Sequence, residues 1–216
     1  MQRDLEPLAL VATTPYVMAV HPSTGVKTVA ELIAYAKARP GKISWGASTP
    51  GTVQHLSGEM FKRMVGIDIV FIPYKGTGAM LPDVLGGRLQ LVVDNILVLT
   101  PHIKLGALNA LAVTTAKRTP ILPDVPSLAE AGVTGFDTSG WFSMYSTPKT
   151  PAAIINRVNQ DTQRVLRQPD IREKFLASGV EVAGGSAEDL AATVKSDRKS
   201  TRLNSSHTDI SRMPSS

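Results

Sequence analysis

Small and hydroxyl-bearing residues follow a short apolar segment of this 216-residue chain in a pattern that suits the binding of an anion. Residues 43–46 form the apolar segment, and the turn after it carries Ser48, Thr49, Gly51 and Thr52. The turn offers hydroxyl groups, little side-chain bulk and backbone N–H groups where a helix is expected to begin. Because a helix N-terminus bears partial positive charge, this turn favours a negatively charged ligand.

A second turn follows a second apolar segment in the same way. Residues 69–72 form the segment, and Tyr74, Lys75, Gly76 and Thr77 come after it. We expect backbone N–H groups of this turn to contact the ligand. Lys75 is either an ordinary surface lysine or a charge partner of the ligand, and the sequence leaves both roles open.

Two further polar residues, Asp94 and Asn95, stand at the end of the apolar segment 89–93. A carboxylate repels another carboxylate at short range. We therefore expect Asp94 to accept hydrogen bonds from N–H and hydroxyl groups or to order water. A structural role and a ligand-binding role remain open for it, and Asn95 is included with it among the candidate ligand-binding residues.

The elements around the first two turns predict how these residues are brought together. Apolar residues recur at helical spacing between 53 and 64, and Gly66 is placed to end that helix. Strand 43–46, this helix and strand 69–72 then form a parallel strand-helix-strand unit. Both turns follow strands of one parallel pair, so they lie on the same edge of the sheet and face a common crevice.

Alternating elements elsewhere predict an α/β protein. The other predicted strands are residues 8–12, 16–20, 89–93, 110–113 and 140–146. Helices are predicted from a capping box at Thr28 and Glu31 to a stop at Pro40, and over 81–85, 96–104, 152–167, 169–177 and 187–195. Residues 114–126 read as a crossing segment outside the core. The part after it has too few strands to bury its helices and is expected to need a sheet that this chain does not supply.

The composition excludes several classes of function. The chain has no cysteine, and its four histidines lack metal-ligand spacing, so we expect no cofactor and no metal site. The net charge of +5 is spread along the chain and aromatic residues make up 5%, which argues against nucleic acid as a partner. No apolar run approaches the ~18 residues of a membrane span.

Longer motifs carry a resemblance to a known family. They are GASTPGTVQHLSGEMFKRMVGIDIVFIPYKGTG, LGGRLQLVVDN, LAVTTAKR, LPDVPSLAEAG and GWFSMYSTPKTP. Over about residues 5–195 the chain resembles the periplasmic solute-binding proteins of tripartite tricarboxylate transporters, the Bug family. The resemblance implies a type II periplasmic-binding-protein-like fold, in which two α/β lobes close on a small carboxylate. It also implies a periplasmic location and delivery of the carboxylate to membrane permease subunits.

The resemblance and the composition together predict the domain organisation. We expect one ligand-binding lobe over residues 1–114, the C-terminal part of a second lobe over 115–196, and a disordered tail over 197–216. The tail resembles translated sequencing-adapter read-through and is expected to be an artefact. The first residues are charged and give no signal peptide, whereas members of the family begin with one. The sequence is therefore expected to be a fragment that lacks its N-terminal part.

Parts of the sequence are also consistent with other functions. The ligand-sensing effector domain of a transcription regulator has a similar two-lobed fold and remains the alternative. A hydrolase that uses Ser48, His55 and Asp94 is disfavoured because the chain has no G-x-S-x-G motif, so we expect no enzymatic activity. His55 on its own is expected to be a surface or core histidine. The aromatic residues of strand 140–146 either line a cleft or belong to a core.

Overall fold

The computed structural model describes residues 5–195, which belong to two compact units. The sheet unit comprises residues 13–140 and 176–180. The helical unit comprises the described residues of the ranges 1–12, 141–175 and 181–216. The predicted tail over 197–216 lies outside the described residues.

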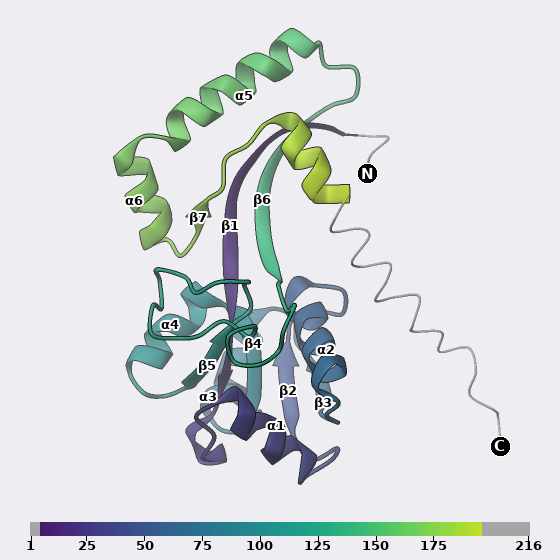
Figure 1. The fold of residues 1–216 in the computed structure, drawn as a ribbon, viewed down its shortest axis with the longest axis vertical. Coiled ribbons are helices and arrows are strands. Elements are labelled where there is room, and N and C mark those ends of the chain that lie inside the picture. The colour runs from purple at the N-terminus through teal and green to yellow at the C-terminus, as the bar shows by residue number, and fades with distance from the viewer. Residues whose placement is uncertain (1–4, 196–216) are drawn as a thin grey trace, which may run out of the picture. The chain divides into compact units, whose positions relative to one another are not determined.

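A mixed β-sheet forms the centre of the sheet unit (Figure 1). Its strands lie in the order β3-β2-β4-β1-β5, where β1 is Glu6–Val20, β2 is Ser44–Ala47, β3 is Val70–Pro73, β4 is Leu91–Asn95 and β5 is Asn109–Val113. β2 runs parallel to β3 and β4, whereas β1 is antiparallel to β4 and β5. The carboxyl ends of β2, β3 and β4 therefore meet at one edge of the sheet.

Helix α2 (Val53–Val65) connects β2 to β3, which confirms the predicted parallel strand-helix-strand unit. The register pairs Trp45 with Phe71 and Ala47 with Pro73, so the two turns that follow start side by side. The helix ends at Gly66, which adopts a left-handed conformation with a φ of 63°. Glycine adopts this conformation without a steric cost, and it commonly ends helices in this way.

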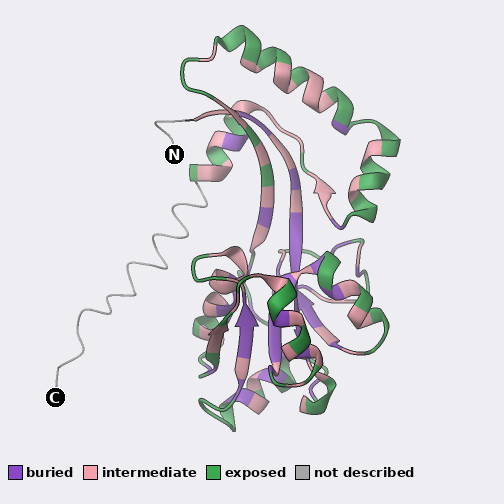
Figure 2. Ribbon diagram, turned by 180° about the vertical axis from the view of Figure 1, so that it is seen from behind, coloured by how far each residue is buried: buried purple, intermediate pink, exposed green. Residues whose placement is uncertain are grey.

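Helices cover both faces of the sheet. The others in this unit are a short 3₁₀ helix η1 (Pro22–Thr24), α1 (Val29–Lys37), α3 (Thr77–Leu85) and α4 (Ile96–Lys104). One core contains residues of α1 and α2, and the other contains residues of α3 and α4. Alternation along β4 supplies both, because Leu91 and Val93 belong to the first core and Val92 to the second. Most residues of β2, β4 and β5 are buried, as is β1 from Tyr16 onward, whereas the edge strand β3 is only intermediate or exposed (Figure 2).

The first strand departs from the prediction of two strands, since β1 continues through the Thr13-Thr14-Pro15 segment. Pro15 lacks an N–H group, but pairing with β4 begins only at Tyr16. The φ angle of proline suits extended backbone, and threonine is a β-branched residue that favours it. The segment is therefore compatible with one uninterrupted strand.

Helix α3 also differs from its prediction, because it begins at Thr77 and not at residue 81. Gly76 precedes it with a φ of 94°, and Pro82 lies inside the helix. Gly78 and Pro82 obscured the first turn in the sequence, because both residues are poor helix formers. The earlier start puts the N-terminus of α3 directly after β3.

Residues 115–140 belong to the sheet unit, so the compact units do not divide at residue 114 as the predicted lobes do. The backbone N–H of Thr138 donates to the carbonyl of Thr114, and Val113 bridges to Ser127. The predicted crossing segment also contributes to the core, since its residue Leu122 is buried in the core that contains α3 and α4. The three prolines of the segment led us to predict a connection outside the core, although the segment also contains apolar residues.

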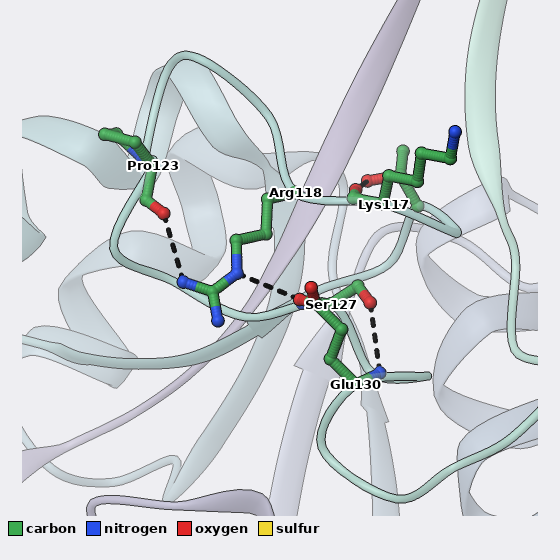
Figure 3. Close-up of polar contacts among 6 residues, drawn as sticks. Lys117, Arg118, Pro123, Ser127 and Glu130 are labelled. Carbon is green, nitrogen blue, oxygen red and sulfur yellow. Dashed lines mark hydrogen bonds and ion pairs between the residues drawn. The ribbon is translucent and has the colours of Figure 1, made fainter.

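Two of the longer sequence motifs are joined by a hydrogen-bonded ion pair in this region (Figure 3). Arg118, from LAVTTAKR, donates to Glu130, from LPDVPSLAEAG, at 3.0 Å. Ser127 and Glu130 exchange hydrogen bonds in the manner of a capping box: the N–H of Ser127 donates to the carboxylate and the N–H of Glu130 donates to the Ser127 hydroxyl. Arg118 also donates to the carbonyl of Pro123 at 3.3 Å. These motifs therefore have an architectural role.

The helical unit contains the first part of β1 together with β6 (Ser139–Ser146), α5 (Ala152–Leu166), α6 (Pro169–Ala177) and β7 (Glu181–Val182). Strands β6 and β7 pair with β1, and residues 187–195 are helical as predicted. Leu166 is the buried residue of α5, and Figure 2 shows this helix exposed along much of its length. Phe142 on β6 is also exposed, at 52%. This unit therefore leaves part of its apolar surface uncovered.

We predict that Gly58→Ala destabilises the sheet unit by about 1–3 kcal/mol, because overpacking of a filled core forces side chains and backbone to shift. Gly58 is buried on α2, and a Cβ atom there would overlap the ring of Trp45 on β2. Urea denaturation followed by tryptophan fluorescence measures the effect. Met64→Ala on the same helix, at a residue that is 43% exposed, is the control and is expected to change stability by less. A Gly58→Ala protein as stable as the wild type would contradict this packing.

Candidate functional site

Three helix N-termini lie at the edge of the sheet where β2, β3 and β4 end. Thr52 precedes α2, Gly76 precedes α3 and Asn95 precedes α4. The Asn95 side chain caps α4 by accepting from the N–H of Leu97 at 2.9 Å. Thr52 and Gly76 make no side-chain capping bond, so the first N–H groups of α2 and α3 are left for another acceptor. Uncapped helix N-termini favour negative charge, so this edge of the sheet is a candidate site for a carboxylate or a similar anion.

The turn between β2 and α2 uses some of its polar groups internally. The Thr52 hydroxyl donates to the carbonyl of Thr49 at 2.8 Å, which closes the turn. Gly51 adopts a φ of 87° there, and its N–H donates to Nδ1 of His55 at 3.2 Å. Within residues 5–195, the hydroxyls of Ser48 and Thr49 make no hydrogen bond and are free to donate to a ligand.

His55 is held against aromatic rings beneath this turn. Its ring stacks on Trp45 at a centroid distance of 6.1 Å and an interplanar angle of 8°, and it lies 4.4 Å from the ring of Phe71. Burial lowers the pKa of His55, and the negative charge of Glu59 opposes this with a smaller effect. Of the alternatives left by the sequence, the half-buried histidine against an aromatic cluster is the one observed.

The second turn is anchored by Tyr74. Its N–H donates to the carbonyl of Ala47 at 3.2 Å, and its hydroxyl donates to Asp83 on α3 at 2.6 Å. Burial and then the hydrogen bond to Asp83 raise the pKa of Tyr74 to about 12. The bonds from Tyr74 and Arg88 lower the pKa of Asp83. Lys75 is exposed, so the Tyr74 side chain stabilises the turn while Lys75 projects from it.

Asp94 is fully buried and connects the strand ends to the helices. One carboxylate oxygen accepts from the Thr77 hydroxyl at 2.6 Å. The other accepts from the N–H of Asn95 at 2.6 Å and from the Gln54 side chain at 3.4 Å. This confirms the expectation that Asp94 accepts hydrogen bonds from N–H and hydroxyl groups. The Thr77 hydroxyl is used in this contact, so backbone N–H groups are the donors that remain in the second turn.

Two residues near Asp94 were not singled out in the sequence. Thr14 is buried on β1, accepts from the Asn95 side chain at 2.9 Å and donates to the carbonyl of Gly179 at 3.4 Å. Tyr16 lies across from Asn95 in the sheet, and its pKa is raised by burial and then by the negative charge of Asp94. The signal for Thr14 was its polar side chain in an otherwise apolar strand, which we interpreted as a break.

The geometry does not assemble the hydrolase triad. The Nδ1 atom of His55 accepts from Gly51, and the Asp94 oxygens are occupied by other donors. A triad requires the acid to hold the histidine and the histidine to contact the nucleophile. The three side chains therefore serve separate purposes here.

No cluster of three or more acidic or histidine side chains within residues 5–195 is arranged to hold a metal ion. The same part of the chain contains no helix with both the length and the apolar character needed to cross a bilayer.

The mixed sheet with helices on both faces is an α/β fold whose helix N-termini meet at one edge, the arrangement of proteins that bind ligands at the carboxyl ends of parallel strands. Residues 1–204 match the model of the Tripartite tricarboxylate transporter family receptor, and the chain belongs to this family. This confirms the resemblance found in the sequence motifs.

Curated relatives extend the comparison. The chain is 31% identical to a UPF0065 protein encoded between tcbD and tcbE in Pseudomonas sp. (strain P51), over 90% of this chain and 58% of the relative. It is 34% identical to BugT of Bordetella pertussis, over 82% of this chain and 54% of BugT. The chain thus spans little more than half the length of these relatives.

Solved structures share the fold. R. palustris Rpa4515, solved with adipate, has 37% identity and a TM-score of 0.85, with 93% of this chain and 67% of that one covered. The periplasmic binding protein BugD has 32% identity and a TM-score of 0.77, with 89% and 65% covered. MatC from Rhodopseudomonas palustris, with bound malate, has 26% identity and a TM-score of 0.71, with 82% and 60% covered. The predicted periplasmic-binding-protein-like fold is therefore confirmed.

We predict that Asp94→Asn lowers the free energy of unfolding by about 1–3 kcal/mol, because the amide presents an N–H group to donors and leaves buried groups unpaired. Asp124→Asn, at an exposed residue, removes the same charge and is expected to stay within about 0.5 kcal/mol of the wild type. Urea denaturation measures both. Equal effects of the two substitutions would show that the contacts of Asp94 do not hold the site together.

Proposed function

We propose that this chain is the carboxylate-binding part of an extracytoplasmic solute-binding protein of a tripartite tricarboxylate-type transporter. A small dicarboxylate places one carboxylate group at the N-termini of α2 and α3. The protein works in the periplasm and passes its ligand to membrane permease subunits. The observation that carries this proposal is the pair of adjacent, uncapped helix ends beside the free hydroxyls of Ser48 and Thr49.

The donor set suits a carboxylate in strength as well as in charge. Each helix N-terminus contributes about 0.3–2 kcal/mol toward holding a negative charge, whereas micromolar affinity requires about 8 kcal/mol. The remainder has to come from direct hydrogen bonds. Backbone N–H groups of both turns and the hydroxyls of Ser48 and Thr49 are the donors available for them.

Relatives support the same class of ligand. Rpa4515 is solved with adipate and MatC with malate, and both compounds are dicarboxylates. Donors at helix ends recognise the carboxylate group and leave the carbon skeleton unspecified. We therefore extend to this chain the class of ligand and not a particular acid.

The same comparisons argue against catalysis. The family is one of receptors, and the histidine and acid of the hypothetical triad hold backbone and side-chain groups of the site. We propose that the chain binds its ligand without transforming it.

We predict that adipate and malate shift the amide resonances of residues 48–54 and 75–78 when they are titrated into the 216-residue chain. We expect a dissociation constant in the millimolar range, because a site formed by one lobe stays open to water and its hydrogen bonds compete with solvent. Two-dimensional ¹H–¹⁵N NMR provides the measurement. Adipamide, which has the same skeleton without charge, is the control and is expected to cause no shifts. Shifts that both compounds cause equally, or that avoid these residues, would contradict the proposal.

The combined substitution Ser48→Ala and Thr49→Ala is predicted to weaken dicarboxylate binding by tenfold or more, which corresponds to about 1.4 kcal/mol. Both hydroxyls are free in the turn, so their removal takes donors from the ligand without breaking an internal bond. The matched control is Thr147→Ala, an exposed threonine of the helical unit. Unchanged affinity in the double variant would remove the side chains of this turn from the site.

A further inference from the structure

We propose that His55 is a positioning residue for the ligand-binding turn, and that only its neutral imidazole holds the turn in the conformation that binds a carboxylate. Protonation of His55 in mild acid then releases the turn and weakens binding. The consequence for the ligand rests on the proposed function above, whereas the control of the turn by His55 does not.

The hydrogen bond between the turn and the imidazole fixes the protonation state. The backbone N–H of Gly51 donates to Nδ1 of His55, with 3.2 Å between the two nitrogens. A nitrogen accepts a hydrogen bond only when it carries no proton, so His55 is the neutral tautomer with its proton on Nε2. A protonated Nδ1 would set one N–H group against another at this distance, and one of the two groups would have to move.

The imidazole is less free to move than the turn. Its ring is stacked on Trp45 and packed against Phe71. Trp45, a residue of β2, is itself completely buried. The turn is exposed at Gly51, and the φ of 87° at this glycine suits no larger residue well. Repulsion between the two N–H groups is therefore relieved by a shift of the turn.

The surroundings of His55 keep it neutral at pH 7. The residues that face it from β2 and β3 are the aromatic Trp45 and Phe71. Glu59, on the same helix, favours protonation, but burial has the larger effect and lowers the pKa below its usual range. Protonation consequently takes place below the ordinary histidine pKa of about 6.5.

The shift matters because the turn between β2 and α2 carries the free hydroxyls of Ser48 and Thr49. The Gly51 N–H is used by His55, and the Thr52 hydroxyl and N–H are used by the carbonyl of Thr49, whereas the Ser48 and Thr49 hydroxyls make no hydrogen bond within residues 5–195. A carboxylate has to meet several of these donors at once, so a displaced turn binds it less well. A protonated His55 would also attract an anion by its charge. If that attraction outweighed the shift of the turn, the ligand would bind more strongly in acid, which is the opposite of what we propose.

Two substitutions distinguish the role of His55 as a hydrogen-bond acceptor from the effect of its protonation. His55→Asn keeps a polar oxygen near the position of Nδ1 and does not titrate, whereas His55→Leu has no acceptor. At pH 7.5 we expect His55→Asn to bind adipate within about threefold of the wild type and His55→Leu to bind at least tenfold more weakly. Between pH 7.5 and pH 5 we expect the affinity of the wild type to fall at least threefold further than that of His55→Asn. The comparison with His55→Asn removes the contribution from protonation of adipate itself.

A readout without ligand makes the test independent of the proposed function. ¹⁵N NMR of the unliganded wild type is expected to show the tautomer with the proton on Nε2 at pH 7.5. It is also expected to show amide shifts of residues 48–52 that follow the His55 titration and are absent in His55→Asn. If these shifts are observed and adipate does not bind, the control of the turn stands and the proposed function fails. A proton on Nδ1 in the neutral form, a turn that ignores the His55 titration, or stronger binding in acid relative to His55→Asn would overturn the proposal.

Discussion

The arrangement of the site depends on the hydrogen bonds that the buried Asp94 side chain accepts. This side chain stands at the end of β4 and accepts hydrogen bonds from the first turn of α2, from the first residue of α3 and from the N–H of Asn95. These contacts join three helix N-termini that are far apart in the sequence. A buried carboxyl group is costly unless its hydrogen bonds are satisfied, so the three elements have to stay together for Asp94 to keep its partners. The Asp94 carboxyl group, whose charge would repel a carboxylate ligand at short range, is enclosed within the protein. The first N–H groups of α2 and α3 stay available at the edge of the sheet.

Close packing on one face of the sheet sets the position of the first turn. Gly58 lets α2 approach the ring of Trp45, and His55 lies on the same ring one helical turn earlier. His55 then holds the turn by its contact with Gly51. The hydroxyl and N–H groups of this turn are therefore positioned by a glycine and an aromatic cluster. On the other side, Tyr74 and Asp83 fix the second turn to α3.

Much of this arrangement followed from the sequence, because regular spacing and turn residues mark most of its elements. The apolar spacing of residues 53–64, the stop at Gly66 and the polar end of β4 predicted the unit that brings the two turns together. The roles within the turns did not follow. Thr52 and Thr77 are among the predicted ligand-binding residues, and their hydroxyls make internal hydrogen bonds, with the carbonyl of Thr49 and with Asp94, that the sequence did not predict. Asp94 is 17 residues from Thr77 along the chain, and no local pattern predicts that contact, whereas Thr52 bonds to a residue only three positions earlier. The continuity of β1 was missed for a related reason, since the partners of Thr14 lie at Asn95 and Gly179.

A crystal structure of this chain soaked with adipate at saturating concentration tests the central claim most directly. The account predicts that one carboxylate group lies at the N-termini of α2 and α3, within hydrogen-bonding distance of backbone N–H groups of both helices and of the Ser48 or Thr49 hydroxyl. It also predicts that Asp94 keeps its contacts with Thr77 and Asn95 in the bound state. A carboxylate group bound elsewhere, or one held at this edge only by Lys75, would contradict it.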